Sequence, residues 1–133
     1  MLTVPLLLAV AGVAGIVFSY RALGSIGRSV ARGTLSKNWA TFSAAGHFVG
    51  FLAGFASWPL SGFLSYPVAT PGGTGRFAGL PFAVAFFDED GLCFGIRFQV
   101  LMLIGNGLFW FLSPQAVLWI AARPHVKREA VPD

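Results

Sequence analysis

Residues 43–60 read SAAGHFVGFLAGFASWPL, and the character of this stretch decides the predicted fold. It carries no charged residue and lies within a longer apolar run, Asn38–Tyr66. A helix needs ~20 apolar residues to cross the core of a bilayer, so this run is long enough. A similar run, Leu2–Tyr20, precedes it, and another, Phe98–Ala122, follows it. The sequence therefore predicts an all-α membrane protein with three transmembrane helices.

The overall composition also indicates a membrane protein. Hydrophobic residues make up 56% of the 133 residues and charged residues only 11%, whereas soluble domains have about 25% charged residues. The net charge of +4 does not indicate a nucleic-acid partner, because the basic residues stand at the ends of the apolar runs. We therefore expect the lipid bilayer, and no nucleic acid, among the partners.

The whole chain, residues 1–133, is predicted to be a single integral membrane domain. The first run is expected to be a retained span, because a signal peptide has basic residues before its apolar core and here they begin after it, at Arg21. Pro114 is expected either to kink the third span or to begin a new helix, with residues 114–122 bending toward the interface. The predicted spans are residues 2–20, 39–64 and 98–122, and the predicted outside loop is 67–97.

The charges of the connecting segments predict the orientation. The segment 21–38 holds basic residues and no acid, and the tail after Ala122 holds three more basic residues with two acids. The segment 67–96 holds one basic residue, Arg76, and three acids. Cytoplasmic segments of membrane proteins are enriched in Lys and Arg, so the N-terminus and the long loop are expected outside and the C-terminus in the cytoplasm. The residues counted are Arg21, Arg28, Arg32, Lys37, Asp88, Glu89, Asp90, Arg123, Lys127, Arg128, Glu129 and Asp133.

The outside loop is predicted to be structured, with a short β-hairpin. Two apolar runs, Phe82–Phe87 and Leu92–Phe98, flank an acidic turn that ends at Gly91. The three acids of the turn supply too few oxygens for a calcium site, and no histidine or serine set accompanies them on that side. The lone cysteine, Cys93, is expected to behave as a small apolar residue. We therefore expect a solvated turn, no metal, no catalytic residue and no enzymatic activity.

The same part of the chain carries a resemblance. The GLPF element at Gly79–Phe82, the acid-glycine turn and the aromatic run LIGNGLFW at Leu103–Trp110 resemble a loose group of small, uncharacterised bacterial inner-membrane proteins. In that group, a Gly-hydrophobic-Pro-Phe element in an outside loop precedes an aromatic last span. The resemblance implies a multi-pass protein of the bacterial inner membrane and implies no mechanism.

Two rows of small residues are predicted to be helix-packing faces. Small residues four positions apart lie on one face of a helix and let another helix approach closely. The rows can pack on each other, or the second can dock on another subunit. They are Ala11, Gly15 and Ser19 in the first span and Gly46, Gly50 and Gly54 in the second.

His47 is the candidate functional residue, because an ionisable group inside a membrane span is costly. In the first interpretation, a neutral His47 hydrogen-bonds Asn106 or Gln99 of the third span, or another chain. In the second, it is the axial ligand of a tetrapyrrole, either bacteriochlorophyll or haem. A histidine followed eleven residues later by a tryptophan resembles photosynthetic antenna polypeptides, which implies His47 as ligand with Phe51 and Trp58 against the ring. A proton relay is a third interpretation, although His47 has no acidic neighbours.

These observations predict a non-enzymatic accessory or structural subunit of a larger bacterial membrane complex, with other membrane subunits as partners. The alternative is a pigment- or haem-binding subunit of a photosynthetic or respiratory complex. A second alternative is a small transporter or channel protomer, for which the third span offers Gln99, Asn106 and Gln115 but no charged pathway.

Overall fold

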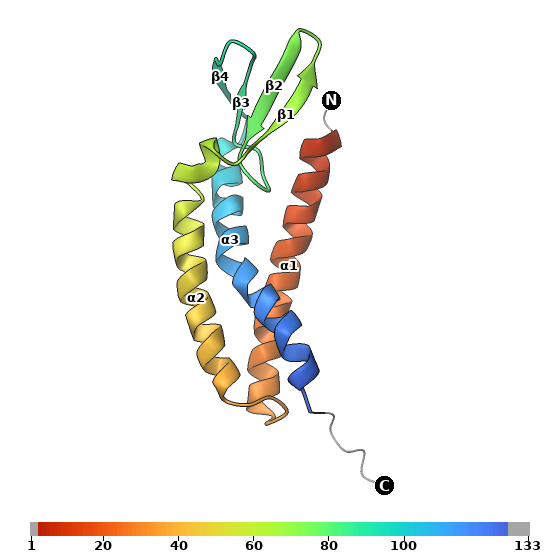
Figure 1. Ribbon diagram of the computed structural model, residues 1–133, viewed down its shortest axis with the longest axis vertical. Helices are drawn as coiled ribbons and strands as arrows, with labels where there is room; N and C mark the ends of the chain where they lie inside the picture. Colours follow the sequence, from red (N-terminus) through yellow and green to blue (C-terminus); the bar gives the residue numbers. More distant parts are fainter. Residues whose placement is uncertain (1–2, 128–133) are drawn as a thin grey trace.

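The computed structural model describes residues 3–127 and shows three helices and a four-stranded antiparallel sheet. Figure 1 shows the helices lying side by side, with the sheet beyond one end of the bundle. Two short 3-10 helices, η1 (Pro59–Gly62) and η2 (Arg123–His125), follow the second and third helices. The helices are α1 (Thr3–Ala31), α2 (Asn38–Ala56) and α3 (Gln99–Ala122), and the strands are β1 (Ser65–Thr70), β2 (Gly73–Ala78), β3 (Ala85–Phe87) and β4 (Cys93–Gly95).

The prediction of an all-α protein with three transmembrane helices is wrong, because this is an α+β fold. Within residues 3–127, only α1 and α3, the latter counted with η2, are long and apolar enough to cross a membrane. The second helix has 19 residues, and its glycines, together with Asn38, Ser43 and His47, lower its hydropathy. The segment 65–95, predicted to be largely a loop, holds the sheet.

The predicted helix ends also differ from those observed. The first helix continues past Tyr20 to Ala31, because arginine is a good helix former and does not end a helix. It stops before Gly33, which has a φ of 72° as is common just after a helix. The second helix ends at Ala56, and the chain continues into η1, where Pro59 occupies the first helical position. Four of the residues named in the sequence analysis, Leu2, Arg128, Glu129 and Asp133, lie outside the described residues.

The third helix is the centre of the bundle. It packs against both α1 and α2, which make few contacts with each other. It runs unbroken through Pro114, so the alternative of a new helix beginning there is wrong. The Ser113 hydroxyl donates to the Trp110 carbonyl (3.1 Å) and does not cap a helix. Figure 1 shows α3 bending midway, so that it begins beside α2 and ends across α1.

The sheet has the strand order β1-β2-β3-β4. The hairpin expected around the acidic turn is β3 and β4, and the Asp88 carboxylate closes the turn by accepting from the Leu92 N–H (2.8 Å). The hairpin of β1 and β2 was not predicted. Each strand contributes one aromatic side chain to a row across one face, with neighbouring ring centroids 5.2–6.5 Å apart. The row is Tyr66, Phe77, Phe86 and Phe94.

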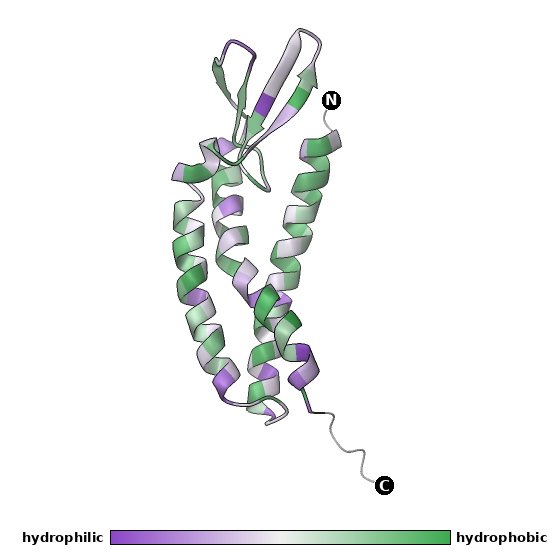
Figure 2. Ribbon diagram, viewed as in Figure 1, coloured by the Kyte–Doolittle hydropathy of each residue, from purple (hydrophilic) through white to green (hydrophobic). Residues whose placement is uncertain are grey.

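Buried apolar residues form two small clusters, one at each end of the bundle. Ala78 and Ala85, at the ends of β2 and β3, form one cluster with Val84, and Ile26 and Ala122 form the other with Leu35. Many large apolar side chains on the helices remain exposed. Figure 2 shows hydrophobic residues on all three helices and hydrophilic ones gathered at the end opposite the sheet. Such a surface is consistent with association of the bundle with a membrane.

Candidate functional site

A buried polar cluster joins α2 to α3 in the half of the bundle away from the sheet. Ser43 and Gln115 are 8% and 0% exposed. The Ser43 hydroxyl donates to the Gln115 side-chain carbonyl (2.8 Å), and the Gln115 amide donates to the Ser43 carbonyl (2.9 Å). A Cβ on Gly46 would lie 3.0 Å from the Gln115 amide nitrogen, so glycine makes room for this side chain. These reciprocal bonds connect the two helices.

His47 belongs to the same cluster. Its Nδ1 lies 2.7 Å from the Ser43 carbonyl and 3.1 Å from the Gln115 amide nitrogen. Because a carbonyl only accepts, the hydrogen-bond network assigns the imidazole proton to Nδ1. The amide nitrogen of Gln115 is also a donor and is then a neighbour of Nδ1 rather than its partner. This tautomer leaves Nε2 of a neutral His47 with a free lone pair.

Nε2 makes no hydrogen bond to a described residue. Tyr66 is the only residue within 3–127 that has a buried side-chain oxygen or nitrogen without a partner. Nε2 is therefore accessible rather than enclosed, and it can accept a hydrogen bond or coordinate a metal.

The predicted partners of His47 on the third helix, Gln99 and Asn106, are wrong. Gln99 is exposed at the start of α3, and Asn106 bonds Phe82. Where α2 and α3 run antiparallel, the glycine row sets their register: Gly54 faces Gly107, Gly50 faces Phe111 and Gly46 faces Gln115. The facing residues of α3 are spaced four apart, as the glycines of α2 are. An antiparallel alignment of the two rows would therefore have predicted Gln115 next to Gly46 and His47.

A second buried polar cluster holds the loop between β2 and β3 against α3. The side chain of Asn106, 1% exposed, accepts from the Phe82 N–H (2.8 Å) and donates to the Phe82 carbonyl (2.7 Å). The indole N–H of Trp110 donates to the Leu80 carbonyl (2.9 Å). In Figure 1 this loop dips between α1 and α3. Side chains of α3 therefore pair the backbone groups that the loop brings into the bundle.

Glycines provide the space for this loop. A Cβ on Gly12 of α1 would lie 2.5 Å from the Pro81 ring, and one on Gly105 of α3 would lie 2.9 Å from the Phe82 ring. The GLPF element singled out in the sequence is therefore a wedge: Pro81 and Phe82 fill the space between the sheet-side ends of α1 and α3. The GLPF element can be recognised in the sequence, but nothing in the sequence connects it to Gly12 and Gly105, the glycines against which it packs.

The two rows of small residues both contact α3 and do not pack on each other. Gly50 lies against the Phe111 backbone, and Gly15 lies against the Phe109 ring. Ser19 is buried, whereas Ala11 is exposed. Within the described part of the chain, the glycine row of α2 is thus already covered.

Apolar grooves flank the second helix, and two of them contain the predicted site residues. The outer groove, about 340 Å³, lies between α2 and α3 near the sheet, and its lining includes Phe51, Gly54, Phe55, Trp58, Leu108 and Phe111. The inner groove, about 430 Å³, lies between α1 and α2 at the opposite end, and its lining includes Leu23, Gly27, Ala31, Ala40, Ala44 and His47.

The predicted tetrapyrrole residues are divided between these grooves. His47 lines the inner groove, while Phe51 and Trp58 line the outer groove. The indole N–H of Trp58 donates to the Leu103 carbonyl (3.0 Å). The pigment interpretation stays a prediction.

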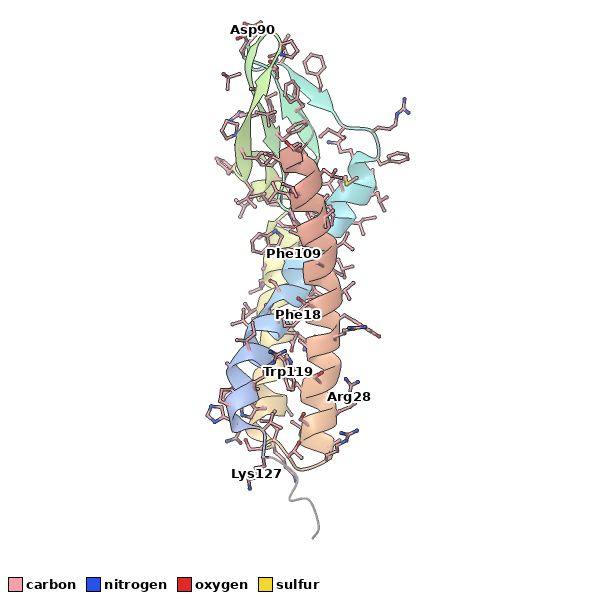
Figure 3. The ribbon with its side chains drawn as sticks, turned by 90° about the vertical axis from the view of Figure 1, so that its right-hand side faces the viewer. Phe18, Arg28, Asp90, Phe109, Trp119 and Lys127 are labelled. Atoms are coloured by element: carbon pink, nitrogen blue, oxygen red, sulfur yellow. The ribbon has the colours of Figure 1, made fainter. Side chains whose placement is uncertain are left out.

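Charged residues lie at the two ends of the molecule. Figure 3 shows Asp90 at the tip of the sheet and Lys127 at the far end of the bundle, with Arg28 near the same end. No group of three His, Cys, Asp or Glu residues that could hold a metal ion occurs within residues 3–127.

Comparison with known proteins finds no family model, no curated protein and no solved structure that matches this chain.

Proposed function

We propose that this chain is a non-enzymatic accessory subunit of a larger protein complex in the bacterial inner membrane. In this proposal α1 and α3 are the two helices that cross the membrane, and α2 packs against α3. The sheet lies outside and the basic end of the bundle lies in the cytoplasm. The distribution of Lys and Arg supports this orientation.

One observation carries the proposal: the buried polar side chains of α2 and α3 serve to connect elements. Ser43 and Gln115 bond each other, and Asn106 bonds the wedge loop. Satisfied polar groups of this kind stabilise a bundle within lipid, where an unpaired backbone group costs several kcal/mol. They support a scaffold that presents a sheet and apolar helix faces to neighbouring subunits.

The outer groove is the surface that we assign to a neighbouring subunit. It is apolar, it is open at the side of the bundle, and aromatic rings form its walls. Aromatic residues are enriched where proteins bind one another. A transmembrane helix of a partner fits the chemistry of this surface.

Site-specific photo-crosslinking in intact cells tests the proposal. A photoreactive phenylalanine analogue at Leu108, in the outer groove, is expected to give one discrete adduct with a different membrane protein. The same analogue at Val10, 60% exposed on α1, is the matched control and is expected to give none. Adducts only with a second copy of this chain would favour the small transporter or channel protomer and contradict the proposal.

The pigment- or haem-binding alternative has one specific observation in its favour. A metal-ligating histidine usually donates its other ring N–H to a backbone carbonyl or a carboxylate. His47 donates Nδ1–H to the Ser43 carbonyl and leaves Nε2 free. An absorption spectrum of the purified complex tests it: a tetrapyrrole band that disappears in His47→Ala would support ligation.

A further inference from the structure

The inner groove is a gap that this chain does not fill. Its lining comes from α1 and α2, so it opens on the side of the bundle away from α3. Leu23, Gly27 and Ala31 form one wall, and Ala40 and Ala44 form the other. The hydroxyl of Ser43, also in the lining, donates to Gln115, so it does not offer a hydrogen to an occupant. The walls therefore suit an apolar chain.

Three exposed basic residues lie close to the end of this groove, at or beside the turn that joins α1 to α2. Arg32 and Lys37 stand at the two ends of that turn. Arg28 lies on the adjoining face of α1, where its guanidinium donates to the Ser25 hydroxyl (3.4 Å). Figure 3 shows Arg28 projecting from α1 on the side opposite the last part of α3. The acids among residues 3–127 are those of the turn beyond the far end of the bundle, so none neutralises this cluster.

An apolar groove with a basic mouth on the cytoplasmic side matches one class of ligand. Basic pockets between membrane helices on that side bind the head groups of anionic lipids. From Ala40 to His47 the second helix rises by about 10 Å, which gives an acyl chain a track of that length. His47 marks the inner end of the track.

We infer that the inner groove holds one acyl chain of an anionic phospholipid of the cytoplasmic leaflet, with its phosphate among Arg28, Arg32 and Lys37. This inference rests on the proposed membrane location and orientation. The lipid would complete the contact between α1 and α2 that the protein alone leaves open.

Native mass spectrometry of the full chain in mild detergent provides the test. Phosphatidylglycerol and phosphatidylcholine with identical acyl chains are added in turn, and we expect bound phosphatidylglycerol to survive at concentrations where phosphatidylcholine is lost. Each basic residue near an anionic head group contributes about a fivefold gain in affinity. The double variant Arg28→Gln with Lys37→Gln should therefore bind phosphatidylglycerol about thirtyfold more weakly. Arg76→Gln in β2, at the sheet end, is the matched control and should bind normally.

A second variant tests the groove itself. A Cβ on Gly27 would have no atom within 4 Å, and Gly27 lines the groove, so the side chain of Gly27→Leu starts in open space and occupies part of the groove. Leucine also favours helix over glycine, so α1 should remain folded. Gly27→Leu is expected to abolish phosphatidylglycerol binding, whereas Ala14→Leu, at an exposed position of α1 outside the groove, is expected to leave it unchanged.

Three results would overturn the inference. They are equal binding of the two lipids, full binding by Gly27→Leu, and a co-purifying tetrapyrrole whose absorption is lost in His47→Ala. Resistance of the protein to extraction from membranes by alkaline carbonate is measured in parallel. A protein that resists extraction but shows no lipid preference refutes this inference and leaves the proposed function standing, whereas a protein that carbonate extracts refutes both.

Discussion

Replacing Asn106 by alanine should release the wedge loop from the bundle. The Asn106 amide forms two hydrogen bonds to the backbone of Phe82, and both groups of Phe82 are deep in the structure, where Phe82 is 8% exposed. No other side chain in the described part of the chain bonds either group. Asn106→Ala therefore leaves a donor and an acceptor unpaired.

The expected loss of stability follows from these two groups. An unpaired buried polar group costs about 1–3 kcal/mol, so two groups cost roughly 2–6 kcal/mol. A domain has a total stability of about 5–15 kcal/mol, so the loss is a large part of it. Because the loop also holds Pro81 against Gly12, its release should loosen the contact between the sheet-side ends of α1 and α3.

Two measurements check this prediction. Unfolding of the purified protein by a denaturing detergent should occur at a clearly lower concentration for Asn106→Ala, and hydrogen exchange at the Phe82 amide should become fast. Gln99→Ala removes an exposed amide from the same helix and serves as the control, with no expected change. An Asn106→Ala variant that keeps native stability and a protected Phe82 amide would refute the assignment of Asn106 as the anchor of the loop.

Three further substitutions follow from the structure. Gly50→Ala would place a methyl group into the Phe111 carbonyl and push α2 away from α3, so the free energy of unfolding should fall by about 3 kcal/mol. Gly62→Ala places its methyl group in open space and should be neutral in the same unfolding assay. Gln115→Leu removes both bonds to α2 and should lower the free energy of unfolding by about 2 kcal/mol, with a smaller loss contradicting the role of this cluster. Burial raises the pKa of Tyr66, so its stabilising effect is complete below the unfolded pKa of about 10 and is lost as pH rises through the higher folded pKa. In alkaline thermal unfolding, Tyr66→Phe should lose this pH dependence without loss of stability at neutral pH, because the hydroxyl has no partner among residues 3–127; an unchanged alkaline profile would contradict it.

The apolar runs, the opposite charges of the two ends and the acidic hairpin turn could be recognised from the sequence, because each depends on local composition. The β1-β2 hairpin could not. Gly73–Ala78 lacks an alternating apolar pattern, and Gly75 is glycine because the Phe86 ring of the neighbouring strand covers it. The need for glycine at position 75 thus depends on a residue of another strand, which the local sequence of β2 does not reveal.

The site illustrates the same limit. His47 stands out in the sequence because an imidazole interrupts an apolar run, but its partners depend on how α2 and α3 align. The alignment comes from the contacts of Gly50 and Gly54 with α3. Residue spacing within one helix does not reveal these contacts.

The proposed orientation places the bundle in a bacterial inner membrane with the sheet outside. The chain has one cysteine, Cys93, which is exposed in β4. The most direct measurement is labelling of Cys93 by a membrane-impermeant maleimide in intact spheroplasts. Cys93 is expected to be labelled fully without permeabilisation. A Cys93→Ser variant that carries Lys37→Cys at the opposite end is expected to be labelled only after permeabilisation. Labelling of Cys93 only after the membrane is opened would refute the proposed orientation.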